Sequence, residues 1–358
     1  MPIKSIELVS FRNHKHVKMD FGSKINLIWG ENGSGKTSIL EAIHILSIGR
    51  SFKTKKLDQT IRANDNNMHL EGLFEVNRAK KRVSFGLRKD GKRRLKLNGI
   101  VLSGSKNLIG ENPVVVLSPE EQLITLGSPA NRRTYFDRVF STVSRPYLEA
   151  LSAFTKTLKQ RNAALRKEGE KASTIEAWNE PLVRYGVQIW RKRKEFLTAF
   201  SEELSAVMKD IQNLSISLRV GQKMDGDAEE SWYHSELLKN YRKDQFLGWT
   251  STGPHRDEIF LLFNDRLLKD FGSQGEHKLS LVLIKLAEFG LIHKLTNISP
   301  TLLLDDLFAK LDLHRGGAVM ELLNQKTQTL ITNADLVGFQ QHGIKVNGDK
   351  NKTFHLVR

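Results

Sequence analysis

Residues 30–38 read Gly-Glu-Asn-Gly-Ser-Gly-Lys-Thr-Ser and match the phosphate-binding loop pattern Gly-x4-Gly-Lys-Thr in full. The loop lies between an apolar strand expected at residues 24–29 and a helix expected at residues 38–49. Glycines let backbone N–H groups point into one concavity, and the N-terminus of the following helix favours phosphate there. The order of strand, glycine-rich loop and helix therefore predicts a nucleotide site in an α/β fold.

The residues of this loop have distinct expected contacts with ATP. Lys36 is expected to reach the β- and γ-phosphates, and the Thr37 hydroxyl is expected to bind Mg²⁺. The ATP site predicted from the loop consists of Gly30, Glu31, Asn32, Gly33, Ser34, Gly35, Lys36, Thr37 and Ser38.

A second acidic element follows much later in the chain, where the apolar residues 301–304 end in Asp305 and Asp306. Asp305 fits the Walker B position that holds Mg²⁺, and Asp306 fits the adjacent acid that orients or activates water. The alternative is that both aspartates only cap the strand. With the loop upstream, the sequence favours the first interpretation, so the predicted catalytic residues are Lys36, Asp305 and Asp306.

Ser273, Gln274 and Gly275 open an amphipathic helix about thirty residues before Asp305. Taken alone, this stretch is a helix N-cap with a permissive glycine. Placed before a Walker B strand, it resembles the signature of ABC ATPases, which contacts the γ-phosphate of ATP held by another copy. The resemblance implies an ATP-dependent homodimer that hydrolysis releases.

The composition is that of a globular chain without disulfides. The 358 residues are 39% hydrophobic and 27% charged, and there are no cysteines. No apolar run reaches the roughly 18 residues that cross a bilayer, and the N-terminal residues lack the features of a secretory signal. The sequence therefore predicts a cytoplasmic protein with no membrane partner.

The net charge of +16 is concentrated in one segment. Residues 50–106 contain 16 Lys and Arg against 5 Asp and Glu. One interpretation is a solvated basic sheet face. The other, which the clusters at residues 80–82 and 92–96 favour, is a surface that binds the phosphates of DNA.

The pattern of the chain indicates two parts. Short alternating strands with turn signals occupy residues 68–102, and stripes at helical spacing predict two or three long helices over residues 145–212. Residues near 225 read as a loop or linker. The expected division is residues 1–140 with 250–358 as an ATPase head with a basic β-subdomain, and residues 141–249 as a helical lobe.

The motifs together resemble the SMC/Rad50-type ABC heads, and within that group the RecF family. The resemblance covers nearly the whole chain. Beyond the loop, the signature and the Walker B strand, it rests on four blocks: SFRNH (10–14), GRSFKT (49–54), LSPEEQLITLGSPANRRTYFD (117–137) and TGPHRDE (252–258). The last two blocks are not generic ATPase motifs.

This resemblance implies a fold, a function and partners. The fold would be an ABC-type P-loop ATPase head, a mixed sheet with flanking helices, plus a mainly helical inserted lobe. The protein would be a slow, DNA-stimulated ATPase acting as a switch in DNA repair, recombination, replication and the SOS response. It would bind duplex DNA and gapped or junction DNA, and help to load recombinase at gaps together with RecR and RecO.

The resemblance also assigns residues outside the loop. Arg12 and Asn13 would lie close to the nucleotide, although surface positions beside an edge strand are the alternative. Asp312 would be the D-loop aspartate near the ATP face of the dimer.

Several residues have no role that the sequence explains. Arg132 and Arg133 could touch DNA or brace the lobe through carboxylates such as Asp137, and the sequence does not explain His255 and Arg256. Departures from the usual family pattern concern the dimer and the hydrolysis rate. Lys310, Glu276 and His277 bear on the strength of the dimer, and the short side chain of Asp306 favours slow hydrolysis.

Two other functions remain as alternatives. An ATP-dependent nuclease of the overcoming-lysogenisation type would need a carboxylate-rich metal-binding domain beyond the ATPase core. An ABC transporter ATPase would carry a switch histidine after the strand that ends at residues 330–335, and none is present. The sequence therefore favours the DNA-binding ATPase.

Overall fold

The computed structural model describes residues 3–76, 79–169, 171–208, 215–220, 229–305, 327–335 and 350–357. The chain divides into two compact units, Met1–Gln122 with Leu281–Arg358 and Leu123–Ser280. The second unit is wider than the helical lobe expected at residues 141–249, because α3 (Pro129–Val143) packs against α4 (Arg145–Leu165) and β10 (Ile259–Phe263). The division into a functional head and lobe stays a prediction.

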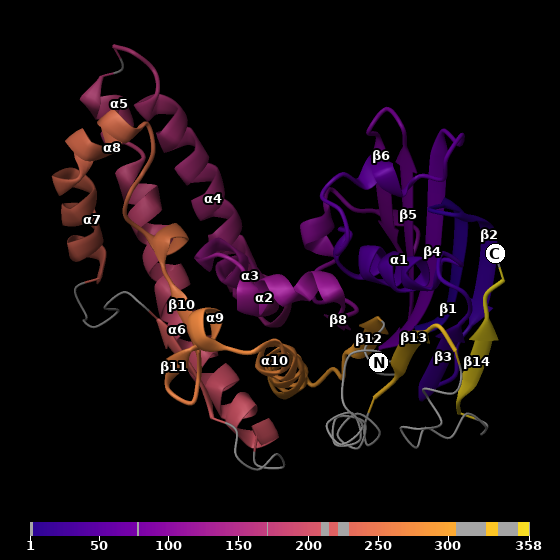
Figure 1. Ribbon diagram of the computed structural model, residues 1–358. Coiled ribbons are helices and arrows are strands. Elements are labelled where there is room, and N and C mark those ends of the chain that lie inside the picture. The colour runs from indigo at the N-terminus through magenta and orange to yellow at the C-terminus, as the bar shows by residue number, and fades with distance from the viewer. Residues whose placement is uncertain are drawn as a thin grey trace. The chain divides into compact units, whose positions relative to one another are not determined.

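The first unit contains an antiparallel and a parallel sheet (Figure 1). The antiparallel sheet has the order β2-β1-β4-β5-β6-β7, with strands at His14–Asp20, Ile3–Phe11, Asn67–Val76, Ala79–Arg88, Arg93–Leu97 and Ile100–Val101. The parallel sheet has the order β14-β3-β13-β12-β8, with strands at Lys352–His355, Ile25–Trp29, Thr329–Asn333, Thr301–Asp305 and Val114–Leu117.

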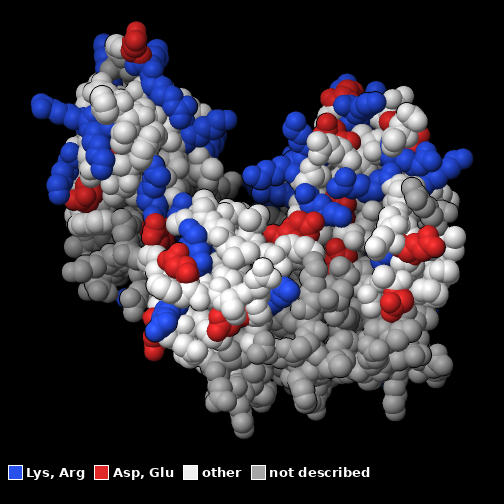
Figure 2. All heavy atoms as spheres, in the orientation of Figure 1, with Lys and Arg blue, Asp and Glu red and all other residues white. Residues whose placement is uncertain are grey.

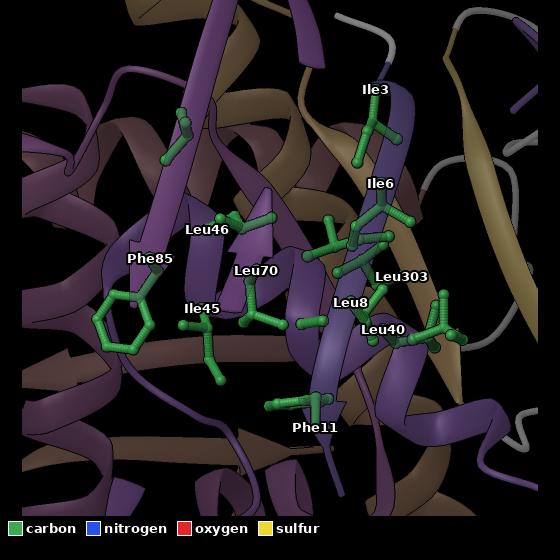
Figure 3. Packing of buried hydrophobic residues seen from close by; sticks show 14 of the residues in the cluster. Ile3, Ile6, Leu8, Phe11, Leu40, Ile45, Leu46, Leu70, Phe85 and Leu303 are labelled. Carbon is green, nitrogen blue, oxygen red and sulfur yellow. The ribbon is translucent and has the colours of Figure 1, made fainter. Parts of the chain in front are cut away.

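Helix α1 (Lys36–Ile48) contacts strands of both sheets. Its residues from Ile39 to Ser47 are all buried, so the helix is covered around its whole circumference rather than on one stripe. Figure 3 shows side chains of α1 packed against those of β1, β4, β5 and β12. Each fully buried Leu or Ile contributes about 1.5–3 kcal/mol, so this core holds α1 firmly between the sheets.

The parallel sheet places several functional positions at one edge. Strands β12 and β13 are buried along their whole length, as is typical of parallel strands covered on both faces. In the register, Trp29 pairs with Asn333, and Asp305 pairs with Thr332. The loop that follows Trp29 therefore starts at the same carboxyl edge that carries Asp305.

The second unit is mainly helical. Its helices are α2 (Leu123–Leu126), α3, α4 (Arg145–Leu165), α5 (Ala172–Glu176), α6 (Asn179–Met208), α7 (Glu229–Lys239), α8 (Tyr241–Leu247) and α9 (Leu268–Phe271). A small antiparallel sheet joins β9 (Ile216–Val220), β10 (Ile259–Phe263) and β11 (Arg266–Leu267). Helix α10 (Gln274–Thr296) begins in this unit and ends in the first.

Helices α4 and α6 are antiparallel neighbours. Asn179 at the start of α6 contacts Arg161 near the end of α4, whereas Arg193 later in α6 contacts Tyr147 near the start of α4. The two long helices expected over residues 145–212 are therefore confirmed, with the short α5 between them.

Two fully buried arginines connect these helices to the segment after α8. Arg193 binds Asp137 at 2.8 Å, Asp257 at 2.5 Å and the Pro254 carbonyl at 2.7 Å. Arg161 binds Asp244 at 2.8 Å and the Thr250 hydroxyl at 2.7 Å. Buried charges persist only when they are paired and hydrogen-bonded, so these contacts fix how the segment lies on the helices.

Most of the predicted elements are confirmed. The strands expected at residues 24–29 and over residues 68–102 are present, as are the helices after the loop and after Ser273. The sequence analysis did not predict β2, β9 and β14. The loop expected near residue 225 lies outside the described residues. Among the described helices, none is long and apolar enough to cross a membrane.

Candidate nucleotide-binding site

The loop between β3 and α1 depends on glycines with left-handed backbone angles. The φ angles are +86° at Gly33 and +95° at Gly35, and Gly35 is the residue that precedes α1. A Cβ atom at Gly35 would lie 2.4 Å from His14 Nε2, and one at Gly30 would lie 2.2 Å from the Leu356 carbonyl oxygen. A side chain at Gly30 would therefore collide with backbone, whereas one at Gly35 would displace Asn13 and His14 and be strained by the positive φ angle.

The loop and the Walker B strand meet at a hydrogen bond between residues far apart in the sequence. The Thr37 hydroxyl donates to Asp305 Oδ1 at 2.8 Å, and the Thr332 hydroxyl donates to the same oxygen at 2.7 Å. Asp305 is buried in this contact. The structure thus brings together the hydroxyl and the carboxylate that the sequence predicts as Mg²⁺ ligands.

The Lys36 ammonium folds back onto its own loop. It donates to the carbonyl oxygens of Gly30 at 2.7 Å and Glu31 at 2.9 Å. These contacts hold the side chain across the mouth of the loop, where a phosphate oxygen could replace the carbonyls.

The donor groups of the loop fit a phosphate ligand. The Ser34 hydroxyl is buried and has no hydrogen-bond partner among the residues that the structure describes. A buried hydroxyl without a partner is costly, so a ligand oxygen would satisfy it. Mg²⁺ prefers oxygen ligands and usually takes one or two protein groups together with phosphates, which the Thr37–Asp305 pair can supply.

Arg12 is held by a carboxylate of α1. Its guanidinium binds both oxygens of Glu41, at 2.8 and 2.6 Å, and also donates to the Gln59 carbonyl at 3.1 Å. Glu41 is fully buried and accepts a further hydrogen bond from the Ser51 hydroxyl. These contacts tie the SFRNH and GRSFKT segments to α1, while direct contact of Arg12 with nucleotide stays a prediction.

Asn13 and His14 contact the loop itself. Asn13 Nδ2 donates to the Gly33 carbonyl and His14 Nε2 hydrogen-bonds the Gly35 carbonyl, both at 3.1 Å. Burial lowers the pKa of His14, which favours the neutral ring with its Nε2–H donating. The sequence analysis did not assign a role to His14, Glu41 or Thr332, although each stands inside a motif or strand that it identified.

The signature segment forms a helix cap on α10. The Ser273 backbone N–H donates to Glu276 Oε2 at 2.7 Å, and the Glu276 N–H reaches the Ser273 hydroxyl at 3.3 Å. This reciprocal arrangement is a capping box, which gives Glu276 a structural role. Ser273, Gln274 and Gly275 are exposed, and their contact with ATP stays a prediction.

Three residues from the sequence analysis lie outside the described residues, namely Asp306, Lys310 and Asp312. Their expected roles stay predictions.

The arginines of the 117–137 block brace the second unit. Arg132 is buried and donates to the carbonyls of Ile259 at 2.6 Å and Gly127 at 2.9 Å. Arg133 donates to the Asp257 carbonyl at 2.5 Å. Of the two interpretations left open, these contacts favour bracing, but through backbone carbonyls rather than through Asp137.

The TGPHRDE block is a structural junction. His255 Nε2 hydrogen-bonds the Thr250 carbonyl at 2.9 Å, and burial lowers its pKa to about 4. The Arg256 guanidinium lies 3.8 Å from the centre of the Trp249 ring. Asp257 is fully buried between Arg193 and the Trp190 indole N–H.

The basic segment of the first unit forms one face of a sheet. Along β5, the buried Val83, Phe85 and Leu87 alternate with residues of the opposite face. The opposite face of β5 and β6 carries Arg82, Arg88, Arg94 and Lys96. Figure 2 shows Lys and Arg side chains gathered over these strands. This outer face of β5 and β6 is the candidate DNA surface.

Comparisons with known proteins agree with this fold. The model of the RecF/RecN/SMC N-terminal domain matches residues 2–342. The DNA replication and repair protein RecF of Agathobacter rectalis is 32% identical over 361 residues, covering 100% of this chain and 98% of the relative. The RecF of Chlamydia muridarum is 33% identical and covers 93% of this chain and 92% of the relative.

Solved structures show the same architecture. The ATP complex of the recombination mediator protein RecF superposes with a TM-score of 0.87 at 29% identity, over 93% of this chain and 92% of the other. The Smc head domain of Pyrococcus furiosus has a TM-score of 0.55 at 16% identity, which supports the fold alone. The predicted fold class, an ABC-type α/β head with a mainly helical part, is therefore confirmed, and the chain belongs to the RecF family.

Proposed function

We propose that the protein is an ATPase of DNA replication and recombinational repair that binds DNA under the control of ATP. The observation that carries this proposal is the hydrogen bond between Thr37 and Asp305, residues separated by 268 positions. A threonine that ends a phosphate-binding loop and an aspartate that ends a buried parallel strand are the pair that holds Mg²⁺ in P-loop ATPases. The family relatives are DNA replication and repair proteins, and a solved relative contains ATP.

The residues of the site have separate tasks in this proposal. Thr37 and Asp305 would hold Mg²⁺, which when bound supplies positive charge beside the β- and γ-phosphates. Lys36 would exchange the Gly30 and Glu31 carbonyls for phosphate oxygens, and the loop N–H groups would donate hydrogen bonds to the other phosphate oxygens. Asp306 would orient the attacking water. Its short side chain suits slow hydrolysis, and therefore a switch rather than a motor.

Dimerisation would couple this site to DNA. Ser273 precedes a 23-residue helix that begins with Gln274 and Gly275, and these exposed residues at the helix N-terminus suit a contact with the phosphate of ATP bound to a second copy. Asp312 would lie at the same interface. Relatives are described in the RecFOR pathway, so RecR and RecO are the proposed protein partners.

The outer face of β5 and β6 supplies the proposed duplex contact. Arg94 and Lys96 lie on the strand opposite Gly86 and Ser84, and no ion pair binds them within the described residues. Phosphates of DNA are the ligand that such unneutralised cations attract, without regard to base sequence. Substitution of Arg94 and Lys96 by Ser should reduce the salt dependence of duplex binding by about two in the slope of log K against log salt.

Light scattering and ATP binding test the proposal in parallel. Lys36→Ala and Asp305→Asn should abolish ATP binding or hydrolysis and the ATP-dependent dimer, whereas Asp306→Asn should prolong the dimer. Lys15→Ala, an exposed lysine of β2, is the control and should bind ATP normally. An unchanged mass and unchanged DNA affinity on addition of Mg-ATP would contradict the switch.

A further inference from the structure

The second unit carries another basic surface, at the end where α4 and α8 meet. It consists of Lys159, Arg166, Arg242, Lys243, Arg256 and the exposed Phe246, and is called the cationic tip below. In Figure 2, Lys and Arg side chains gather over the end of this unit that carries α5 and α8 in Figure 1. Neither the nucleotide site nor the outer face of β5 and β6 accounts for it.

Contacts between α4 and the segment after α8 hold these side chains on one surface. Arg166 Nε donates to the Gly248 carbonyl at 3.0 Å. A Cβ atom on Gly248 would come within 3.1 Å of Arg166 Cγ, so the arginine stem lies directly on the glycine that caps α8. Asn162 Oδ1 accepts from both the backbone N–H and the hydroxyl of Thr250 at 2.8 Å. Lys159, Asn162 and Arg166 are three and four residues apart and share a helix face.

The charge of this surface is one-sided. Residues 150–167 contain five Lys and Arg and no Asp or Glu. Residues 239–256 contain four Lys and Arg and a single acid, Asp244. Asp244 is buried and bound to the buried Arg161, so the two cancel inside the unit. Among the described residues, no ion pair neutralises Lys159, Arg242 or Lys243, and the positive excess is left at the surface.

Phe246 is the feature that distinguishes the cationic tip from the first basic face. Its side chain is 90% exposed, the highest exposed fraction of any large apolar side chain described. Arg242 and Lys243 stand four and three residues before it on α8, so both cations lie on the same side of the helix as the ring. In the described part of the first unit, the large apolar side chains that are exposed include no aromatic ring. That face therefore offers contacts for phosphates alone.

A ring among cations matches the chemistry of single-stranded nucleic acid. Unpaired bases stack on aromatic side chains while Lys and Arg follow the backbone phosphates. Bases in a duplex are already stacked on one another, so an exposed phenylalanine gains little from duplex DNA. An acidic protein surface would use the cations but would leave the ring in water.

We propose that the cationic tip binds single-stranded nucleic acid, with an unpaired base stacked on Phe246 and phosphates bound by Arg166, Arg242 and Lys243. The proposal rests on the DNA-binding function proposed above and deepens it. It assigns the single-stranded part of a gapped substrate to the second unit and the duplex part to the outer face of β5 and β6.

The test is fluorescence anisotropy with a labelled oligo(dT) strand and, separately, a blunt duplex, using the full chain. Phe246→Ala should weaken oligo(dT) binding about tenfold and leave duplex binding unchanged. Phe246→Trp should retain or strengthen oligo(dT) binding, whereas Phe246→Leu should behave like Phe246→Ala because stacking needs a ring. Phe271→Ala, which removes another exposed phenylalanine of the same unit, should change neither affinity.

The salt dependence tests the cations independently of the ring. Arg242→Ser with Lys243→Ser should lower the slope of log K against log salt for oligo(dT) by about 1.4, since each phosphate contact contributes about 0.7 for single strands. Both residues are exposed, so the variants should unfold at the wild-type urea concentration.

The outcomes separate this proposal from the function on which it rests. Equal oligo(dT) binding by the wild type and Phe246→Ala overturns the cationic tip as a single-strand site, whatever the duplex does. If the wild-type protein does not bind the blunt duplex, the duplex-binding function proposed above is overturned. Displacement of oligo(dT) by polyglutamate at equal charge, with no effect of Phe246→Ala, overturns the proposal in favour of an acidic protein partner.

Discussion

The interiors of the two units of this molecule are stabilised by different chemistry. The first has a core of Ile, Leu, Val and Phe side chains in which α1 fills the space between sheets. In the described part of the second, the largest fully buried side chains are Arg161 and Arg193, and Arg193 also contacts the Tyr147 hydroxyl. An apolar core fixes a helix by shape and volume, whereas a paired buried arginine fixes it by direction, because each N–H must meet a particular oxygen.

The two units also differ in where they place their polar groups. The first unit keeps polar groups at one edge of its parallel sheet, where Thr37 and Asp305 meet. The second uses its polar groups internally, to hold the segment 250–257 against α4 and α6. Four predictions test whether the two units respond differently to substitution and to pH. Equal responses would contradict the comparison.

The largest effect is expected at Arg193. Arg193→Met keeps most of the volume but leaves Asp257 buried without its cation. The free energy of unfolding should fall by about 3–5 kcal/mol, measured by urea denaturation. Lys192→Met next to it removes the exposed pair with Glu195 and a cation–π contact with Phe196, and should cost less than about 1 kcal/mol. Similar losses for both variants would mean that the buried network does not hold the second unit.

The second effect is a dependence on pH that belongs to the helical unit. Burial lowers the pKa of His255 from 6.5 to about 4, so the unfolded chain takes up a proton that the folded chain refuses. Stability is therefore highest above pH 6.5 and is lost as the pH falls toward 4, by up to about 3 kcal/mol. Part of the cause is that His255 Nδ1 is buried without a partner in the described structure, so a proton there would be unsatisfied.

Hydrogen exchange locates this pH effect. Amides of α4 and α6 should lose protection between pH 6.5 and 4 after correction for intrinsic rates, and His255→Gln should flatten the dependence. The lowered pKa values of His14 and His277 act in the same direction, so only the difference between wild type and His255→Gln counts. An identical pH profile for the two proteins would remove His255 as the cause.

The third effect separates the site from the core that supports it. Gly35→Ala places a methyl group at φ +95° and within 2.5 Å of Asn13 Oδ1 and His14 Nε2. The fold should lose about 1–2 kcal/mol, but ATP binding should be lost entirely because the loop must shift. Gly33→Ala meets no atom within 4 Å and carries only the cost of its backbone angle, so it should retain part of the ATP binding. Equal ATP affinity of the two variants would contradict the importance of the close approach at Gly35.

The smallest effect is expected in the apolar core. Leu303→Met in β12 preserves volume and hydrophobicity and should cost less than about 1.5 kcal/mol in a urea titration. Comparison of Leu303→Met with Arg193→Met tests whether the core of each unit tolerates methionine. If Leu303→Met lowered the free energy of unfolding by more than about 3 kcal/mol, the two cores would be similarly sensitive to methionine and the comparison would fail.

The sequence predicted those features whose partners are near in the chain or belong to a known pattern. The loop at residues 30–38, its helix and the strand that ends at Asp305 each follow from local pattern, and the structure contains all three. Strand β2, His14–Asp20, was not predicted because its residues are mostly charged or polar and its apolar alternation is weak. Strand β14 has only four residues, and its pairing with β3 spans more than 300 positions.

The roles of the motif residues could not be predicted for a related reason. Arg132 meets Ile259 and Arg133 meets Asp257, in each case more than 120 positions away. Sequence spacing gives no information about which carbonyl a buried arginine will reach. His14 was closer to prediction, since it follows Asn13 in a quoted motif, but only the approach to Gly35 reveals its contact.

The order of the parallel sheet has a consequence for synthesis of the protein. Strand β3 pairs with β13 and β14, whose residues are made about 300 positions after it. At roughly 5–20 residues per second, the ribosome takes about 15–60 s to supply these partners. Throughout that time β3 has neither of its sheet neighbours, and α1 can pack only on strands made earlier, such as β1, β4 and β5. The nascent chain is therefore exposed to aggregation and to chaperones. The second unit, which is one continuous stretch from Leu123 to Ser280, can fold while the first is still incomplete.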